Sequence, residues 1–429
     1  MWLLSIGLAI LLCCIILGIP VAFSIGLASV ILMSIGFEHF RYEALAQWVL
    51  YGINNFTLLA VPLFLLAGRL MNSGGITQRI FRFANALVGV FRGGLGYVNV
   101  VVSMIFAGMS GAAVADVAGL GTVEIKAMDD AGYDRDFSIG ITASSSVVGP
   151  IIPPSIPIVI FAIMAEISVG KLLIAGIIPG IVIGVVLMSM VGLIARIRDY
   201  PRQGEWSLRE LWESFKGAFL SLLTPLILIG GILSGVFTAT EAAAIAVLYA
   251  LILGLFIYRE YSFKDLISIL IESMRDSAVV LFIVACAKLY SFVITYCNIP
   301  SQMASMISSI TGNPWIILGL IVVLLLLLGC FMEPVAGITI TLPVILPLAK
   351  QVGINSLHLG IVMVYTLVIG LLTPPVGLAV YTLSKVTKEP PENIFKSCIP
   401  FYIPLFLSLL VIMFCPFLTT WLPSVIITK

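Results

Sequence analysis

The chain has 429 residues, of which 61% are hydrophobic and 10% are charged, and its formal net charge at pH 7 is +1. A soluble domain usually carries about 25% charged residues, so this composition, with a mean hydropathy of +1.18, excludes a soluble globular protein. Continuous apolar runs of about 20 residues predict an all-α polytopic membrane protein, since the strands of a β-barrel would alternate.

The first half opens with three predicted spans. The N-terminal apolar run lacks the basic start and the small-residue cleavage site of a signal peptide, so it is interpreted as the first span. Residues 76–92 place apolar side chains on one face and arginines on the other, which is typical of an amphipathic interfacial helix. An exposed end of an ordinary span explains them equally well. The three spans cover residues 2–17, 19–35 and 45–68.

Cysteine and histidine give no metal motif. The seven cysteines lie in or beside apolar runs without C-x-x-C or Cys/His spacing, and the chain has only two histidines. We therefore expect buried packing cysteines, with no transition-metal site, no disulfide framework and no His-based catalytic triad.

A small-residue cluster and a proline pair mark the interior of the first half. Residues 94–125 are apolar but contain the sequence GMSG at 108–111, which predicts a re-entrant helical hairpin instead of a straight span. The apolar run at 137–166 contains a Pro-Pro pair, and proline breaks a helix by removing backbone hydrogen bonds. Unwound backbone inside a membrane is tolerated only where it lines a cavity or is covered by protein.

A polar stretch at 201–217 predicts an amphipathic linker, with Trp206 and Trp212 as interfacial anchors. The second half then repeats the plan of the first, including a second apolar run broken by a proline pair. After the first broken helix, the predicted elements are spans at 171–195, 218–236, 239–258, 278–297 and 300–311, a hairpin at 314–350, a broken helix at 356–385 and a last span at 393–421.

A gapless shift of 221 residues, the separation of Pro153 from Pro374, relates the two halves. The same shift carries Gly149 onto Gly370. We therefore interpret residues 1–200 and 218–429 as homologous repeats.

Charge placement predicts that the repeats are inverted. Residues 69–93 hold four arginines, whereas the equivalent residues 290–314 hold no Lys or Arg. By the positive-inside rule, equivalent loops then lie on opposite faces of the membrane. Counting the basic loops, Arg69 among them, as cytoplasmic places both termini on the periplasmic side.

Broken helices in opposed halves are typical of secondary transporters, because the two faces can open alternately around one site. Unwound carbonyl oxygens can bind a small cation such as Na+, and half-helix N-termini attract anions. The simpler alternative is that glycine and proline here only permit close packing and a kink. The predicted sodium-binding residues are Gly108, Ser110, Gly149 and Ile152 in the first half and Gly329, Gly370, Thr373 and Val376 in the second.

Four charged residues stand in apolar context. Asp116 and Glu333 flank the two hairpin tips and are predicted to take part in substrate binding. Capping or bracing its hairpin explains Asp116 equally well. Glu241 and Lys288 have either a functional or a structural role, since a charge inside a membrane is costly and needs a partner or a route to the interface.

Four blocks of the sequence resemble the large membrane (M) subunit of tripartite ATP-independent periplasmic (TRAP) transporters, of the dicarboxylate type. The resemblance covers essentially the whole chain. The blocks are FAGMSGAAVADVAGLGTVEIKAM at 106–128, AGYDRDFSIGITASSSVVGPIIPPSIPIVIFA at 131–162, LLGCFMEPVAGITITLPVILP at 327–347 and LLTPPVGLAVYTLSKV at 371–386.

This resemblance implies a sodium-driven elevator in the bacterial inner membrane, in which a transport domain with both hairpins and both broken helices slides against a scaffold. It implies a small membrane (Q) subunit, expected to be separate because the chain begins at its first span, and a periplasmic substrate-binding (P) protein. The implied substrate is an organic acid such as a C4-dicarboxylate or a sialic acid. By position, the implied sodium ligands fall on the residues named above and the substrate contacts on Ser110 and Ser155. Ala112 stands where many relatives have Ser.

Other classes stay open at this point. An ion-coupled anion transporter without a binding protein has the same features. A channel would need a continuous polar pore, and a membrane-embedded enzyme would need a convergent acid, base or metal set. We expect no enzymatic activity and no nucleic-acid partner.

Overall fold

The computed structural model describes residues 6–36 except 8, 12, 15 and 16, then 42–202, 207–300, 302–303 and 311–426. The predicted span at 2–17 lies partly outside these residues, and Trp206 and most of the predicted span at 300–311 lie outside them. Every named element within them is helical. The described helices that are long and apolar enough to cross a membrane are Phe56–Ser73, Val169–Ile197, Leu208–Leu233, Ala239–Ile257, Phe263–Tyr296, Pro334–Gln351 and Pro391–Phe414.

An asparagine divides the third predicted span. Helix α3 (Tyr42–Ile53) stops before Asn55, whose backbone is extended and whose side chain accepts a hydrogen bond at 2.9 Å from the N–H two residues later. The 3-10 turn η1 (Phe56–Leu59) then leads directly into α4 (Ala60–Ser73). The prediction of one span over 45–68 is therefore wrong, because an Asn cap starts a new helix inside it.

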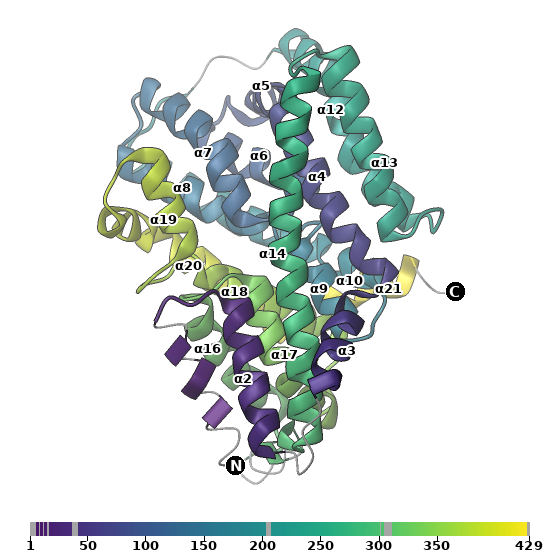
Figure 1. The fold of residues 1–429 in the computed structure, drawn as a ribbon. Coiled ribbons are helices and arrows are strands. Elements are labelled where there is room, and N and C mark those ends of the chain that lie inside the picture. Colours follow the sequence, from purple (N-terminus) through teal and green to yellow (C-terminus); the bar gives the residue numbers. More distant parts are fainter. Residues whose placement is uncertain are drawn as a thin grey trace.

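Each half contains a helical hairpin. In the first, residues 111–112 join α6 (Gly94–Ser110) to α7 (Ala113–Asp130). In the second, α16 (Pro314–Gly329) turns into α17 (Pro334–Gln351). Figure 1 shows α6 and α7 in the upper part of the molecule and α16 and α17 in the lower part. The two hairpins therefore occupy opposite ends, as expected of inverted repeats.

Each half also contains a helix broken at its proline pair. In the first, α8 (Arg135–Ser145) and the 3-10 turn η2 (Ser146–Val148) are separated from α9 (Ile156–Met164) by an unwound segment. In the second, α18 (Ser356–Gly370) is separated in the same way from α19 (Leu378–Thr387). Both Pro-Pro peptide bonds are cis.

The broken helices form the centre of the molecule. Every residue of α18 from His358 to Gly370 is buried, and so is every residue of α8 from Phe137 to Ser145. A helix that is buried all round is surrounded by protein, unlike a helix with one lipid-facing side. The first unwound segment is buried throughout, which meets the condition for irregular backbone inside a membrane. In the second unwound segment, Pro374 and Pro375 are exposed.

Two long helices cross predicted boundaries. α12 (Leu208–Leu233) joins the polar linker to the following span, and α14 (Phe263–Tyr296) begins well before the predicted span at 278–297. A Ser–Asp capping box starts α14, and no Gly or Pro interrupts it. Figure 1 shows α14 running nearly the full height of the molecule. The remaining helices are α2 (Val21–Gly36), α5 (Ile76–Val88), α10 (Val169–Ala175), α11 (Ile177–Ile197), α13 (Ala239–Ile252), the π-helix η3 (Leu253–Ile257), α20 (Pro391–Phe414) and α21 (Phe417–Ile426).

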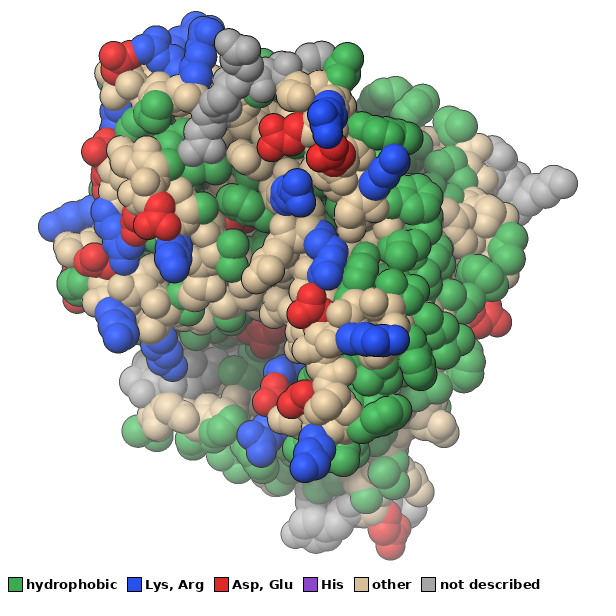
Figure 2. All heavy atoms as spheres, turned by 90° about the horizontal axis from the view of Figure 1, so that it is seen from above, with side chains coloured by type: hydrophobic (Ala, Val, Ile, Leu, Met, Phe, Trp, Pro, Cys, Tyr) green, Lys and Arg blue, Asp and Glu red, His purple; other side chains and the backbone are tan. Residues whose placement is uncertain are grey.

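Charged side chains gather on the upper face of the molecule. Figure 2, which views this face directly, shows Lys and Arg interspersed with Asp and Glu beside a broad apolar flank. Large hydrophobic side chains such as Leu226, Phe256 and Met274 are exposed. An apolar flank next to a charged face is the surface that a lipid bilayer and its aqueous boundary require.

Candidate functional site

The tip of the first hairpin lies against the first unwound segment. Gly111 has a φ of 63°, and a Cβ at this position would clash with Pro154 O. Both the positive φ and the close approach therefore require glycine. One turn earlier, a Cβ at Gly108 would lie 2.7 Å from Pro225 Cβ of α12. Ser110 ends α6, and its side chain lies outside the described part of the chain.

The Ser155 hydroxyl closes the first unwound segment. As the N-cap of α9, its Oγ accepts a hydrogen bond from Ile158 N at 3.3 Å, and it donates to Pro150 O at the start of the segment. Ser155 is fully buried. In this structure the hydroxyl predicted to contact substrate is thus occupied in holding the break together.

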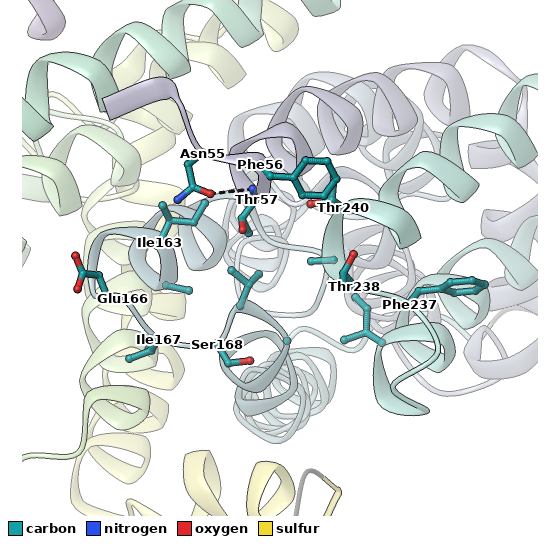
Figure 3. A pocket seen from close by; sticks show the side chains of 15 residues that line it. Asn55, Phe56, Thr57, Ile163, Glu166, Ile167, Ser168, Phe237, Thr238 and Thr240 are labelled. Carbon is teal, nitrogen blue, oxygen red and sulfur yellow. Dashed lines mark hydrogen bonds between the residues drawn. The ribbon is translucent and has the colours of Figure 1, made fainter. Parts of the chain in front are cut away.

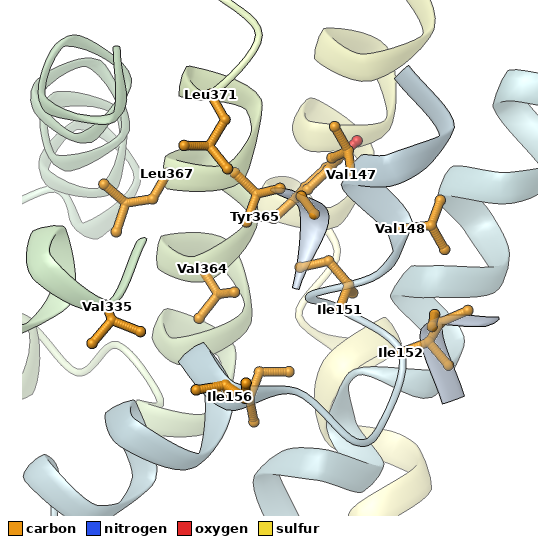
Figure 4. Packing of buried hydrophobic residues seen from close by; sticks show 14 of the residues in the cluster. Val147, Val148, Ile151, Ile152, Ile156, Val335, Val364, Tyr365, Leu367 and Leu371 are labelled. Atoms are coloured by element: carbon orange, nitrogen blue, oxygen red, sulfur yellow. The ribbon is translucent and has the colours of Figure 1, made fainter. Parts of the chain in front are cut away.

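Apolar packing brings the two broken helices together. Figure 4 shows Ile151 and Ile152 of the first unwound segment in the same cluster as Val364 and Tyr365 of α18. The Tyr365 hydroxyl is satisfied by Leu405 O at 3.2 Å and by the Ser408 hydroxyl. The first unwound segment and α18 of the second half therefore belong to one continuous core.

Asp116 lies beside the backbone of the first break. Its side chain is on the first turn of α7 and is 1% exposed. A Cβ at Gly149 would collide with Asp116 Oδ2. The fold therefore brings together a predicted substrate residue and a predicted sodium residue that are far apart in sequence.

The second break is built on two glycines. A Cβ at Gly370 would lie 2.5 Å from Gly329 Cα, so the ends of α16 and α18 meet backbone to backbone. Thr373 Oγ1 donates to Gly370 O at 3.0 Å and lies 3.0 Å from Cys330 Sγ. Val376 is half-buried in the same unwound segment. Three of the four predicted residues of this half are thus in direct contact.

Glu333 borders a charged cluster that was not predicted from the sequence. It is the exposed N-cap of α17, and its side chain makes no capping hydrogen bond. The negative charge of Asp276 on α14 acts on it. Arg69 pairs with both Asp276 and Glu272 of α14. The expectation of Arg69 in a loop is wrong, because it lies inside α4 and ties α4 to α14.

The structure also assigns contacts to Glu241 and Lys288. Glu241 completes a capping box at the start of α13, where its carboxylate accepts from Thr238 N at 2.8 Å. Lys288 is half-buried on α14, with Nζ 3.9 Å from Glu166 Oε1. Glu241 therefore has a structural role in this state, and Lys288 pairs weakly with a carboxylate.

A cavity of about 350 Å³ separates the first break from α12. Gly108 and Ile152 line one wall, and apolar side chains of α12 line the other. The α12 residues are Phe215, Phe219, Leu222, Leu223, Pro225, Leu226 and Ile229.

A larger and more polar cavity of about 580 Å³ lies between η1, the α9–α10 connection and the α12–α13 connection. Figure 3 shows Asn55 and Thr57 on one side and Thr238 and Thr240 on another, with Glu166 at the edge. Pockets for small ligands usually measure about 300–1,000 Å³, so both cavities are of suitable size. The larger cavity was not predicted from the sequence. Its signal there is a set of polar residues at the starts of helices, such as Asn55 and Thr238.

Comparison with known proteins identifies the family. Residues 8–418 match the model of the "Tripartite ATP-independent periplasmic transporter, DctM component". A sialic acid TRAP transporter large permease protein of Vibrio cholerae is 44% identical over 410 residues, which is 95% of each chain. A C4-dicarboxylate TRAP transporter large permease protein of Pseudomonas aeruginosa is 40% identical over 370 residues, covering 86% of this chain and 87% of that one.

A solved structure shares the fold. The YdaH transporter of Alcanivorax borkumensis superposes with a TM-score of 0.65 at 14% identity, covering 87% of this chain and 88% of that one. At this identity the likeness concerns the fold alone. The family match and the sequence relatives carry the assignment, and they name transporter permeases, not enzymes. The chain therefore belongs to the DctM-component family of tripartite ATP-independent periplasmic transporters, and is a multi-pass large permease subunit of the inner membrane.

Proposed function

We propose that this permease imports an organic acid into the bacterial cytoplasm, driven by a sodium gradient. Its relatives are named for sialic acid, C4-dicarboxylates and 2,3-diketo-L-gulonate, all of which carry a carboxylate. The tripartite family and the name "large permease" support two partners, a small membrane (Q) subunit and a periplasmic substrate-binding (P) protein.

The second break carries the proposal of sodium coupling. The Thr373 hydroxyl and the Gly370 carbonyl lie 3.0 Å apart, and Gly329 packs beside them without a side chain to cover the backbone. Hydroxyl and carbonyl oxygens are the ligands that half-helix ends offer to Na+. This supports one sodium site at Gly329, Gly370, Thr373 and Val376, and an equivalent one at Gly108, Ser110, Gly149 and Ile152.

Four residues are proposed to contact the substrate: Ser110, Ser155, Asp116 and Glu333. The serines can donate to a substrate carboxylate, Ser155 by exchanging its bond to Pro150 O. Asp116 and Glu333 repel a carboxylate, so they would accept hydrogen bonds from hydroxyl or amide groups of the substrate.

An elevator movement accounts for the position of the cavities. Both cavities lie between α12 or the α12–α13 connection and elements of the broken helices. We assign α2–α5 and α12–α14 to a scaffold and both hairpins, both broken helices and the remaining helices to a mobile part. The charge distribution along the sequence supports periplasmic termini.

Sodium binding is tested without a substrate by melting the purified protein in NaCl, KCl or choline chloride at equal ionic strength. A ligand that binds only the folded state stabilises it by RT ln(1 + [L]/Kd), which is about 2.7 kcal/mol at a hundredfold excess over Kd. We expect NaCl alone to raise the melting temperature. Thr373→Ala should reduce this stabilisation by about 1 kcal/mol, because it removes one oxygen ligand.

Thr382→Ala is the matched control, since its hydroxyl bonds within helix α19 to Leu378 O at 2.9 Å. It should keep the full sodium effect. Equal melting in all three salts would refute sodium coupling. A sodium effect that survives Thr373→Ala would place the ion elsewhere.

A further inference from the structure

Five polar side chains from three helices meet in the apolar core of the first half. Asn99 and Ser103 come from α6, Glu124 from α7, and Thr142 and Ser145 from α8. None of them is more than 2% exposed. The proposed sodium and substrate sites use none of these residues.

A chain of hydrogen bonds in this cluster leads to the carboxyl of Glu124. Ser103 Oγ donates to Ser145 Oγ at 3.0 Å, and Ser145 Oγ donates to Asn99 Oδ1 at 2.6 Å. Asn99 Nδ2 then donates to Glu124 Oε2 at 2.9 Å and to Thr142 Oγ1 at 2.7 Å. Among the described residues, the carboxyl thus receives one N–H, and its Oε1 atom is buried without a hydrogen-bond partner.

The charge of an ionised Glu124 is not balanced. Within the described part of the chain, no Lys or Arg forms an ion pair with it. Burying an unpaired carboxylate costs more free energy than one hydrogen bond returns. The geometry therefore calls for a positive charge at the carboxyl itself.

We propose that the buried Glu124 carboxyl, held by Asn99, is a proton-binding site. A hydronium ion of the solvent supplies the proton: one of its O–H bonds breaks, leaving water, and an O–H bond forms at the Glu124 carboxylate, which becomes a neutral acid. A metal ion fits poorly, because Asn99 presents an N–H donor to Glu124 where an oxygen ligand would be needed. This inference goes beyond the proposed function, which uses neither residue.

The charged groups around Glu124 also favour a proton at its carboxyl. Helix α6 carries no charged side chain. On α8, Arg135 pairs with Asp129 and Asp136 pairs with Arg198 at the first turn, and on α19 Lys385 is exposed. On α7 itself, Asp116 is the group whose negative charge acts on Glu124. A second negative charge nearby disfavours an ionised Glu124 further.

Infrared spectroscopy tests the proposal directly, because a neutral carboxylic acid has a C=O stretch separate from carboxylate and amide bands. The full-length protein is labelled with ¹³C-glutamate and measured at pH 7 in sodium-free potassium buffer. We expect a neutral-acid band that shifts on labelling, loses intensity in Glu124→Gln and keeps its full intensity in Glu392→Gln. Glu392 is an exposed matched control on α20.

If Glu124→Gln fails to fold, Glu124→Asp decides instead, since its carboxyl is unlabelled and the band should lose its sensitivity to ¹³C-glutamate. The absence of a label-sensitive band in the wild-type protein would overturn the proposal. So would a label-sensitive band of undiminished intensity in Glu124→Gln or Glu124→Asp. The sodium experiment is separate, so neither result decides the other.

Discussion

At the scale of single residues, the site depends on glycines, which have no side chain. Gly111, Gly149 and Gly370 each allow a backbone or a carboxylate to approach where a Cβ would collide. Such contacts let the hairpins touch the unwound segments and leave carbonyl oxygens uncovered. Two of these glycines, Gly149 and Gly370, were identified from the sequence as sodium candidates, and a side chain is sterically excluded at both.

Gly370→Ala should destabilise the protein by about 2–3 kcal/mol, because the new methyl group overpacks rigid backbone. The partner is Gly329 Cα, 2.5 Å away, which has no rotamer to change. A melting curve in detergent measures the effect. Gly230→Ala is the control, since nothing lies within 4 Å of its added Cβ. Equal melting of the two variants would contradict the close backbone contact.

At the scale of elements, helix caps and helix breakers determined where the predicted helix boundaries agreed with the structure and where they differed. The hairpins and broken helices were predictable because small residues and proline pairs interrupt long apolar runs. The division of the third span at Asn55 was not predicted, since one capping side chain is a weak signal in an apolar stretch. Conversely, α14 continues through a predicted boundary because its sequence contains no breaker.

The end of α11 is joined to the start of α8 by ion pairs with a defined pH dependence. Arg198 bonds Asp136 at 2.8 Å through both guanidinium Nη atoms, and these hydrogen bonds hold the pKa of Asp136 below its usual value. The stabilisation is therefore present above the unfolded-state pKa, about 3.9 for Asp, and is lost as the pH falls below it. Because Asp136 is half-exposed, it is worth about 1 kcal/mol or less.

Arg198→Gln should lower the melting temperature at pH 7 slightly and flatten its fall between about pH 5 and 3, where an aspartate titrates. Melting in detergent across this range measures both effects. Arg209→Gln removes an exposed i,i+4 pair with Glu213 and should change neither. An unaltered acid limb in Arg198→Gln would show that this pair does not link the two helices.

At the scale of the whole molecule, an elevator requires the contact between α4 and α7 to slide. A Cβ at Gly119 of α7 would lie 2.8 Å from Asn72 Nδ2 of α4. The same Cβ would lie 3.3 Å from Asn72 Cγ. Cysteine side chains at these two positions are therefore within reach of a cross-link. The proposal predicts that such a link arrests transport.

The double variant Asn72→Cys/Gly119→Cys, made after replacing the native cysteines, should lose most of its uptake in proteoliposomes on oxidation and regain it on reduction. The control Leu172→Cys/Gly360→Cys links α10 to α18 within the mobile part, where a Cβ at Gly360 would lie 3.0 Å from Leu172 Cδ1. It should keep its uptake. Full uptake by the oxidised first variant would exclude sliding of α7 along α4.

The sequence alone determined the class of protein, its helical hairpins, its two broken helices and its family resemblance. Each of these follows from local signals, namely apolar run length, helix breakers and repeated motifs. Only the tertiary structure decided which residues meet. Arg69 pairs with α14 and Glu124 bonds Asn99 across 25 residues of sequence, because helix packing brings distant positions together and no local pattern encodes that contact.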